Sequence, residues 1–505
     1  MPAADVDVNR ELNRLVRFAL LQGLIEAEDA VWAANGLIGE LGLPDLRAEP
    51  VTDDLLPESS PDGILERILD WAEAAGIIEG GPEERDLLDT RLMGVLTPRP
   101  SDVVKRFRAL YRTSPRGATD YFYGLGVASN YVRSARTARN IRWRTRTDFG
   151  ELDVTINLSK PEKDPRDIAR AGKAPARGYP RCLLCRENEG FFGHPGHPAR
   201  QNLRLIPLDL RQGQSWFLQY SPYSYYDEHC IVLNGEHVPM AITRETFENL
   251  LRFLDLFPHY FVGSNADLPI VGGSILSHDH YQGGRFVFAL DRAQVEREYP
   301  ARDSVAMGRV NWPMSVLRLA SREAAPLIDA ACGVLEAWRG WSAPEVGVLS
   351  RTGDVPHNTV TPIARRRDGR YELDLVLRNN RTSPEHPLGI FHPHADVQHI
   401  KKENIGLIEV LGLAILPPRL KGALSEMAEA WLRGEADLSA HPALAAHDAW
   451  YRGLRERHVG LEAEAVPGMF RDEVGRVFAR VLSDCGVFKR DDAGLEAFDQ
   501  FAAAL

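Results

Sequence analysis

Two patterns of apolar residues divide the chain near residue 120. Before that point, apolar residues recur with helical spacing, as at Leu12, Val16 and Ala19, which predicts helices from about residue 9 to 115. After it, short runs rich in β-branched and aromatic residues predict strands at 151–158, 215–220, 229–234, 285–290 and 371–379. Helices are predicted at 243–257 and again from about residue 420.

The order of these elements favours an α+β fold. Strands and helices do not alternate regularly, so mixed antiparallel sheets are favoured over a doubly wound parallel sheet. Two short strings, SHDH at 277–280 and FHPH at 391–394, also echo each other. Two related halves with one H-x-H string each would explain this echo, and chance is the alternative.

Composition narrows the class of protein. The 505 residues carry 60 Lys and Arg against 71 Asp and Glu, a net charge of −11. This acidic balance argues against a general affinity for nucleic acid or membranes, but a local basic pocket would still suit a small phosphorylated ligand. No apolar run approaches the roughly 18 residues that span a bilayer, and the N-terminus has acids where a signal peptide has bases. We therefore expect a cytoplasmic protein.

A C-x-x-C string is the first candidate for chemistry. Cys182 and Cys185, followed by His237 and His278, make up a tetrahedral zinc set of two thiolates and two imidazoles. The alternative is a pair of buried thiols with unrelated histidines. A redox role fits poorly, because no thioredoxin-like βαβ pattern surrounds the two cysteines.

The segment GGSILSHDHYQGG, at 272–284, is the second candidate. In an extended H-x-H string both side chains point the same way, so His278 and His280 are expected to face one pocket. Imidazole is a good nucleophile toward phosphorus at neutral pH, and flanking glycines let backbone approach phosphate oxygens. The alternative is a strand with two surface histidines.

The segment HPHADVQH, at 392–399, is the third candidate. His357 and Glu296, elsewhere in the chain, could join its histidines. Histidines with a carboxylate are suited to a second divalent metal. Exposed loop histidines beside prolines are an equally good interpretation.

Four blocks of the sequence resemble the galactose-1-phosphate uridylyltransferases, in particular their second, longer class. The blocks are YPRCLLCRENEGFFG, SPYSYYDEHCIVLNGEH, FPHYFVGSNADLPIVGGSILSHDHYQGG and HIKKENIGLIEVLGLAILPPRL. The resemblance implies two related histidine-triad-like halves with antiparallel sheets and an added helical N-terminal segment. It predicts the helical segment at 1–118, an N-terminal half with C-x-x-C and HDH at 119–310, and a C-terminal half with HPH at 311–505.

The resemblance also implies a reaction. These enzymes transfer UMP from UDP-glucose to galactose 1-phosphate through a uridylyl-histidine, giving UDP-galactose and glucose 1-phosphate, and a homodimer is expected. His280 matches the second histidine of the family's H-P-H-x-Q motif, with Asp279 in place of the proline, and Gln282 would bond the transferred phosphoryl group. The residues expected to bind substrate are Asn265 and Ser274 for the diphosphate and Lys402 for the nucleotide.

The family's metal ligands map onto two sets of residues. The zinc set is Cys182, Cys185, His237 and His278, and the second, iron-type set is Glu296, His357, His392 and His394. The literal H-P-H string ends at His394 but has Asp396 where a glutamine is required, which makes His394 the second candidate nucleophile.

Two other functions compete with this prediction. One is another histidine-triad nucleotidyl enzyme, such as a dinucleoside polyphosphate phosphorylase or a nucleotide hydrolase. The other is a non-catalytic, zinc-stabilised binding protein.

Overall fold

The computed structural model describes residues 6–53, 56, 59–159, 178–194, 196–273 and 275–505. The chain forms two compact units, each assembled from several segments. The first consists of Met1–Arg139, Ser159–Val238 and His278–Gly284, and the second of Asn140–Leu158, Pro239–Ser277 and Arg285–Leu505. None of the described helices is both long and apolar enough to cross a membrane.

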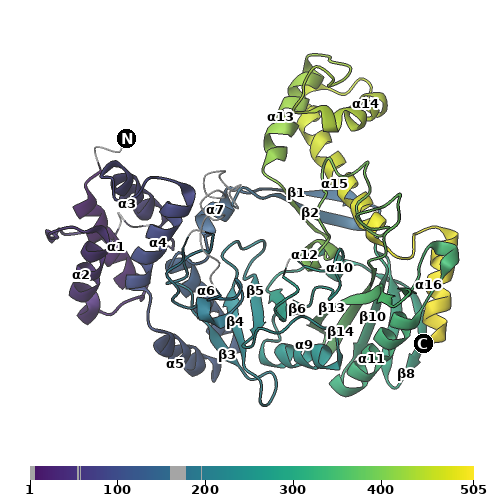
Figure 1. Ribbon diagram of the computed structural model, residues 1–505, viewed down its shortest axis with the longest axis horizontal. Coiled ribbons are helices and arrows are strands. Elements are labelled where there is room, and N and C mark those ends of the chain that lie inside the picture. Colours follow the sequence, from purple (N-terminus) through teal and green to yellow (C-terminus); the bar gives the residue numbers. More distant parts are fainter. Residues whose placement is uncertain (1–5, 54–55, 57–58, 160–177, 195, 274) are drawn as a thin grey trace. The chain divides into compact units, whose positions relative to one another are not determined.

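The first unit opens with a helical segment, purple to blue in Figure 1. In α1 (Val8–Leu21), Leu12 and Ala19 of the predicted stripe are fully buried and Val16 is half-buried, while Leu15 and Phe18 complete the buried face. Proline occupies the first turn of α4, α5 and α6, where its missing N–H costs nothing. The helical N-terminal segment is therefore confirmed. Its helices are α1 (Val8–Leu21), α2 (Ala30–Leu41), α3 (Asp62–Ala74), α4 (Pro82–Leu96), α5 (Pro100–Tyr111) and α6 (Pro115–Ala128), followed by the short α7 (Ser134–Ala138).

An antiparallel sheet follows in the first unit. Its strands pair in the order β3 (Ile206–Leu208), β4 (Trp216–Tyr220), β5 (Cys230–Asn234) and β7 (His280–Gly284). One face is core, where the Tyr281 ring stacks on Trp216 at 5.0 Å between centroids. Because strand side chains alternate, His280 and Gln282 lie on the opposite face of β7.

The second unit holds a larger antiparallel sheet. Its strands pair in the order β6 (Phe261–Gly263), β13 (Asn358–Arg367), β14 (Arg370–Asn379), β10 (Val316–Ser321), β9 (Val305–Val310) and β8 (Val295–Arg302). Helices α9 (Arg244–Leu256) and α11 (Ala324–Gly340) pack against β13, and α11 also packs on β10 (Figure 1). Asp374 on β14 is fully buried between the guanidinium groups of Arg318 and Arg365.

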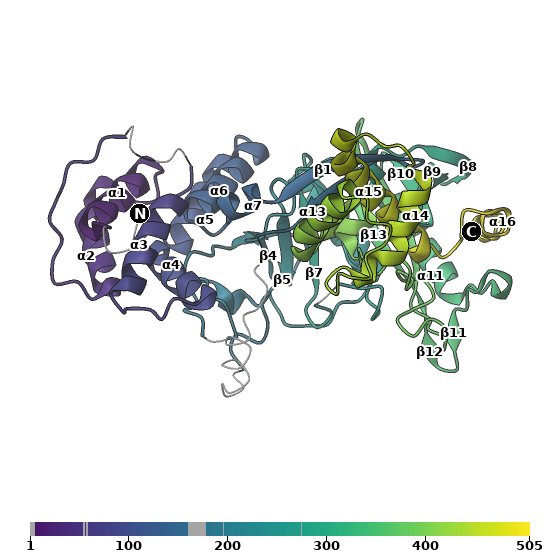
Figure 2. The same ribbon diagram turned by 90° about the horizontal axis from the view of Figure 1, so that it is seen from above.

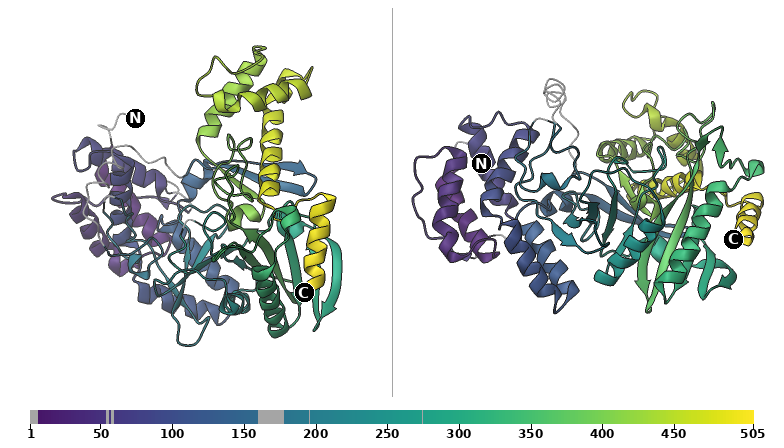
Figure 3. Two further views of the ribbon diagram at one scale, coloured as in Figure 1. Left: turned by 45° about the vertical axis from the view of Figure 1, so that its right-hand side comes forward. Right: turned by 60° about the horizontal axis from the view of Figure 1, so that its bottom comes forward.

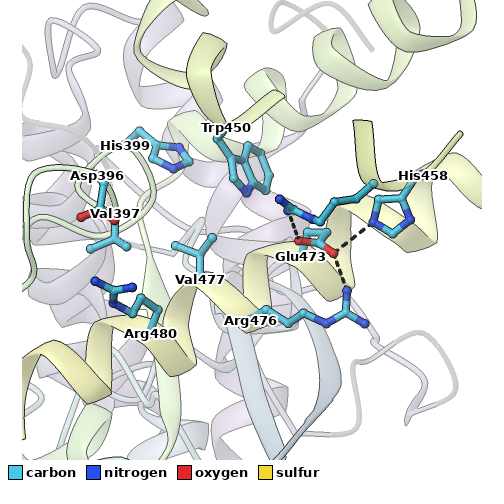
Figure 4. Close-up of a pocket in the computed structure, with 10 residues that line it drawn as sticks. Asp396, Val397, His399, Trp450, His458, Glu473, Arg476, Val477 and Arg480 are labelled. Atoms are coloured by element: carbon cyan, nitrogen blue, oxygen red, sulfur yellow. Dashed lines mark hydrogen bonds and ion pairs between the residues drawn. The ribbon is translucent and has the colours of Figure 1, made fainter. Parts of the chain in front are cut away.

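A helical lobe also belongs to the second unit. Helices α13 (Arg419–Leu432), α14 (Asp448–Arg457) and α15 (Val466–Cys485) lie together (Figure 2). Their shared core includes Trp431, Tyr451 and Phe470. A cavity of about 700 Å³ lies in this lobe, and there the buried Glu473 accepts hydrogen bonds from Arg457, Arg476 and His458 (Figure 4). One buried carboxylate thus binds two arginines and a histidine, which indicates a structural network.

In the rest of the second unit, segments that are distant in the sequence pair with one another. Strand β1 (Ile141–Thr147) pairs antiparallel with β2 (Gly150–Ile156), and β2 pairs parallel with β15 (Leu413–Leu416). The C-terminal helix α16 (Asp492–Ala504) lies beside β8 and β9 (Figure 3). Asp499 of this helix accepts bonds from Tyr299 and Arg309. The second unit also contains the short elements α10 (Ala289–Arg292), β11 (Arg351–Thr352), β12 (Val355–Pro356) and α12 (Leu407–Val410).

The α+β class with antiparallel sheets is confirmed, and so is the predicted helix at 243–257, seen as α9. The strand predicted at 285–290 is wrong, because β7 ends at Gly284 and a short helix, α10, begins at Ala289. The carboxylate of Asp291 accepts the Phe288 N–H and caps this helix, a local bond that outweighs the strand preference of the phenylalanines.

Candidate functional site

Two cysteines and two histidines of the first unit converge on one point. The Cys182 Sγ lies 3.6 Å from the Cys185 Sγ and 3.3 Å from the His278 Nδ1, and the Cys185 Sγ lies 3.2 Å from the His237 Nδ1. Tetrahedral zinc, with Zn–S of about 2.3 Å and Zn–N of about 2.0 Å, sets neighbouring ligand atoms about 3.3–3.8 Å apart. The four donors therefore have the chemistry and the spacing of a zinc site, as the sequence predicts.

Polar groups around the four donors hold them in place. The His278 Nε2 donates to the Asn234 carbonyl at 2.8 Å, which leaves Nδ1 as its ligand atom. The Asn188 amide donates to the carbonyls of Cys182 and Cys185 at 2.8 and 2.7 Å and fixes the C-x-x-C turn. Burial raises the pKa of the Cys182 thiol to about 11, so a thiolate here needs a cation to balance its charge.

His280 begins strand β7, two residues after the predicted metal ligand His278. The strand expected through the whole H-x-H string starts only at His280, so strand alternation does not set the direction of His278, whose ring faces the thiols. The His280 Nδ1 donates to the His278 carbonyl at 2.8 Å. Within the described part of the chain its Nε2 has no hydrogen-bond partner, and burial lowers the pKa of His280 to about 4. A neutral imidazole with an open Nε2 lone pair is the state that a nucleophile requires.

His394, the second candidate nucleophile, is held differently in the second unit. Its Nε2 donates to the Ile390 carbonyl at 3.0 Å, and its Nδ1 lies 3.6 Å from the Asp484 carboxylate. Both ring nitrogens therefore face acceptors, which favours His280 as the nucleophile.

Comparisons with known proteins identify the family of the chain. The family model for the N-terminal domain of galactose-1-phosphate uridyl transferase matches residues 34–239, and that for the C-terminal domain matches residues 253–451. The chain belongs to the galactose-1-phosphate uridyl transferase family. The galactose-1-phosphate uridylyltransferase of Clostridium acetobutylicum is 52% identical over 99% of this chain and 100% of its own length, and that of Bacillus subtilis is 49% identical over 99% and 98%. Among solved structures, a yeast Ap4A phosphorylase is 13% identical over 69% of this chain and 92% of its own, with a TM-score of 0.33, too low to bear on the fold.

The residues expected to bind the substrates of this family belong to other segments than the four metal-binding candidates. Asn265 belongs to the second unit and is buried, and its Oδ1 accepts the Leu407 N–H at 2.9 Å. A Cβ on Gly273 would come within 2.7 Å of the Asn265 Nδ2, so this close approach requires glycine. Lys402 is exposed, whereas its neighbour Lys401 is buried against Glu409. Ser274 lies outside the described residues.

The second metal set predicted from the family is not gathered. Glu296 on β8 is held by the guanidinium groups of Arg309 and Arg490 at 2.7 and 2.5 Å. His357 bonds the side chains of Asn380 and Thr352, and His392 lies 3.2 Å from the Asn404 Oδ1. Among the residues that the structure describes, the zinc set is the one group of three or more such ligands close enough for one ion. The charge of Glu296 is balanced by two arginines, and the second metal set stays a prediction.

Two polar residues near the site were missed by sequence reasoning. Asn188 follows the C-x-x-C string by three residues, and its role depends on a turn that spacing alone does not reveal. His229 lies in the block SPYSYYDEHCIVLNGEH, and its Nε2 lies 3.2 Å from the Gln282 Oε1. The signal for both was their place inside the blocks that carry the family resemblance.

Proposed function

We propose that this chain transfers UMP from UDP-glucose to galactose 1-phosphate through a uridylyl group on His280. The observation that carries the proposal is the bond from the His280 Nδ1 to the His278 carbonyl, which leaves the Nε2 lone pair open. Family membership and relatives about half identical over nearly the full chain support the same reaction.

In the first step, the His280 Nε2 attacks the α-phosphorus of UDP-glucose. An N–P bond forms and the P–O bond to the leaving group breaks, so glucose 1-phosphate departs with the electron pair. In the second step an oxygen of galactose 1-phosphate attacks the same phosphorus, the N–P bond breaks, and UDP-galactose forms. The proton on Nδ1 stays bonded to the His278 carbonyl throughout, so neither step needs a separate base.

The protein positions the reacting groups. Burial keeps His280 neutral at physiological pH, and Gln282 lies on the same face of β7, where its amide would bond a phosphoryl oxygen. Cys182, Cys185, His237 and His278 would hold zinc, which supplies a structural cross-link when bound, since four protein ligands leave no open position. A homodimer, expected for this family, is part of the proposal and is tested by sedimentation velocity.

Product analysis tests the proposed reaction. The protein is incubated with UDP-glucose and galactose 1-phosphate, and the products are separated by anion-exchange chromatography. We expect equal amounts of UDP-galactose and glucose 1-phosphate. Without galactose 1-phosphate no UDP-galactose should form, and glucose 1-phosphate should not exceed one equivalent per chain. Continuous release of UMP into water, or of UDP in phosphate buffer, would indicate a nucleotide hydrolase or phosphorylase instead.

A further inference from the structure

His229 lies beside Gln282 on the face of the first unit's sheet that is opposite Tyr281. In the register of β5 and β7, Ile231 pairs with Gln282 and Leu233 pairs with His280. His229 precedes Ile231 by two residues, so its side chain lies on the same face, diagonal to Gln282. The distance from the His229 Nε2 to the Gln282 Oε1 is 3.2 Å. The His229 backbone is fixed as well, because its carbonyl accepts the Ser221 N–H at 2.8 Å.

The surroundings of His229 decide which ring nitrogen carries the proton. The side chain is 3% exposed, and the rings of Tyr225 and Tyr226 flank it at 5.5 and 4.6 Å between centroids. Burial lowers the pKa of His229 to about 4, so the ring is neutral at physiological pH and has one N–H. The buried Nδ1 has no hydrogen-bond partner within the described residues, whereas Nε2 faces a carbonyl oxygen. The N–H therefore belongs on Nε2 and donates to Gln282.

This bond determines which end of the Gln282 amide is available. With its oxygen occupied by His229, the amide has its NH₂ group available for another acceptor, as far as the described residues go. Gln282 and His280 project from the same face of β7, two residues apart. A turned amide would instead offer its carbonyl oxygen to an anionic phosphoryl group, which would be repulsive.

We propose that His229 is a positioning residue for uridylyl transfer, holding the Gln282 amide with its NH₂ group available to the phosphoryl oxygen. The inference rests on the proposed function and extends it. It also accounts for a buried, neutral histidine that takes no part in the metal group.

Single-turnover kinetics with UDP-glucose test this role. In a rapid-quench experiment the burst of glucose 1-phosphate reports the attack by His280. We expect His229→Phe, which keeps a buried ring but loses the donor, to slow the burst about tenfold, as expected for one misplaced hydrogen bond. The concentration of UDP-glucose at half-maximal rate should change less than twofold, because the bond acts on the transferring phosphoryl group.

Two further variants separate positioning from a structural effect. If His229 acts through Gln282, His229→Phe should have no added effect in a Gln282→Ala background. The matched control is Tyr226→Phe, which removes a bond to the Gly283 carbonyl on the same strand but leaves the His229–Gln282 pair intact. We expect its burst to stay within twofold of wild type.

The outcomes distinguish this inference from the proposed function. If wild-type protein shows a burst and His229→Phe shows a burst at the same rate, the positioning role alone is overturned. An equal slowing in Tyr226→Phe, or additive losses in the double variant, would also overturn it. No burst in wild-type protein that has bound UDP-glucose would overturn the covalent reaction, and the role of His229 with it.

Discussion

Replacing Cys185 by serine tests the metal centre at its most buried thiol. The Cys185 Sγ lies 3.2 Å from the His237 Nδ1 and 3.6 Å from the Cys182 Sγ, so its loss opens one corner of the four-donor set. Serine nearly preserves the volume, but its hydroxyl does not ionise at neutral pH and is a poor zinc ligand. The variant thus removes one ligand with little change in packing.

The size of the effect follows from the number of ligands. Structural zinc sites contribute about 10–16 kcal/mol of apparent binding free energy at pH 7. Shared over four ligands, one thiolate accounts for about 2.5–4 kcal/mol, which corresponds to about 100- to 1,000-fold in Kd. We expect the zinc affinity of Cys185→Ser to fall by this factor.

Competition with a chromophoric chelator measures the affinity directly, and thermal melting with and without chelator measures the coupling to folding. Cys230→Ser is the matched control, because Cys230 is also buried but lies outside the metal group. It should keep the wild-type zinc affinity. Wild-type affinity in Cys185→Ser, or an equal loss in Cys230→Ser, would refute the ligand assignment.

Other contacts yield two further predictions. Asp374→Asn removes the carboxylate between Arg318 and Arg365, so the free energy of unfolding should fall by about 3–5 kcal/mol, seen as a lower urea midpoint. Burial alone would raise the pKa of Asp374, but the two arginines hold it at about 2, so its stabilisation is complete above about pH 4 and is lost as the pH falls toward 2. The variant should accordingly lose less stability than wild type over that acid range, and equal slopes would contradict this. Asn188→Ala frees the carbonyls of Cys182 and Cys185 and should weaken zinc binding about 10- to 100-fold in the same chelator assay, whereas unchanged binding would exclude a role for Asn188 in holding the turn.

Local spacing is enough to predict the C-x-x-C turn and several elements. Cys182 and Cys185 are three residues apart, so one turn presents both thiols, and α9 follows from the apolar stripe of 243–257. The helical N-terminal segment is equally predictable, because helical periodicity depends only on residues that are near in the sequence. The predicted domain boundaries at 118 and 310 stay predictions.

Long-range pairing explains what the sequence did not reveal. Glu296 looked like a metal ligand, but it bonds Arg490, which lies 194 residues further along the chain. His229 and Gln282 are 53 residues apart and meet only because β5 and β7 pair in one register. Neither contact leaves a periodic signal in the sequence, and the failed strand at 285–290 shows how one capping carboxylate overrides β propensity.

Mass spectrometry of the protein mixed with UDP-glucose alone is the most direct test of His280 as the nucleophile. We expect a uridylyl adduct on the peptide that contains His280, which disappears when galactose 1-phosphate is added. The adduct should be absent in His280→Ala and retained in His394→Ala. An adduct on another histidine, or turnover with no adduct on the His280 peptide, would contradict the account.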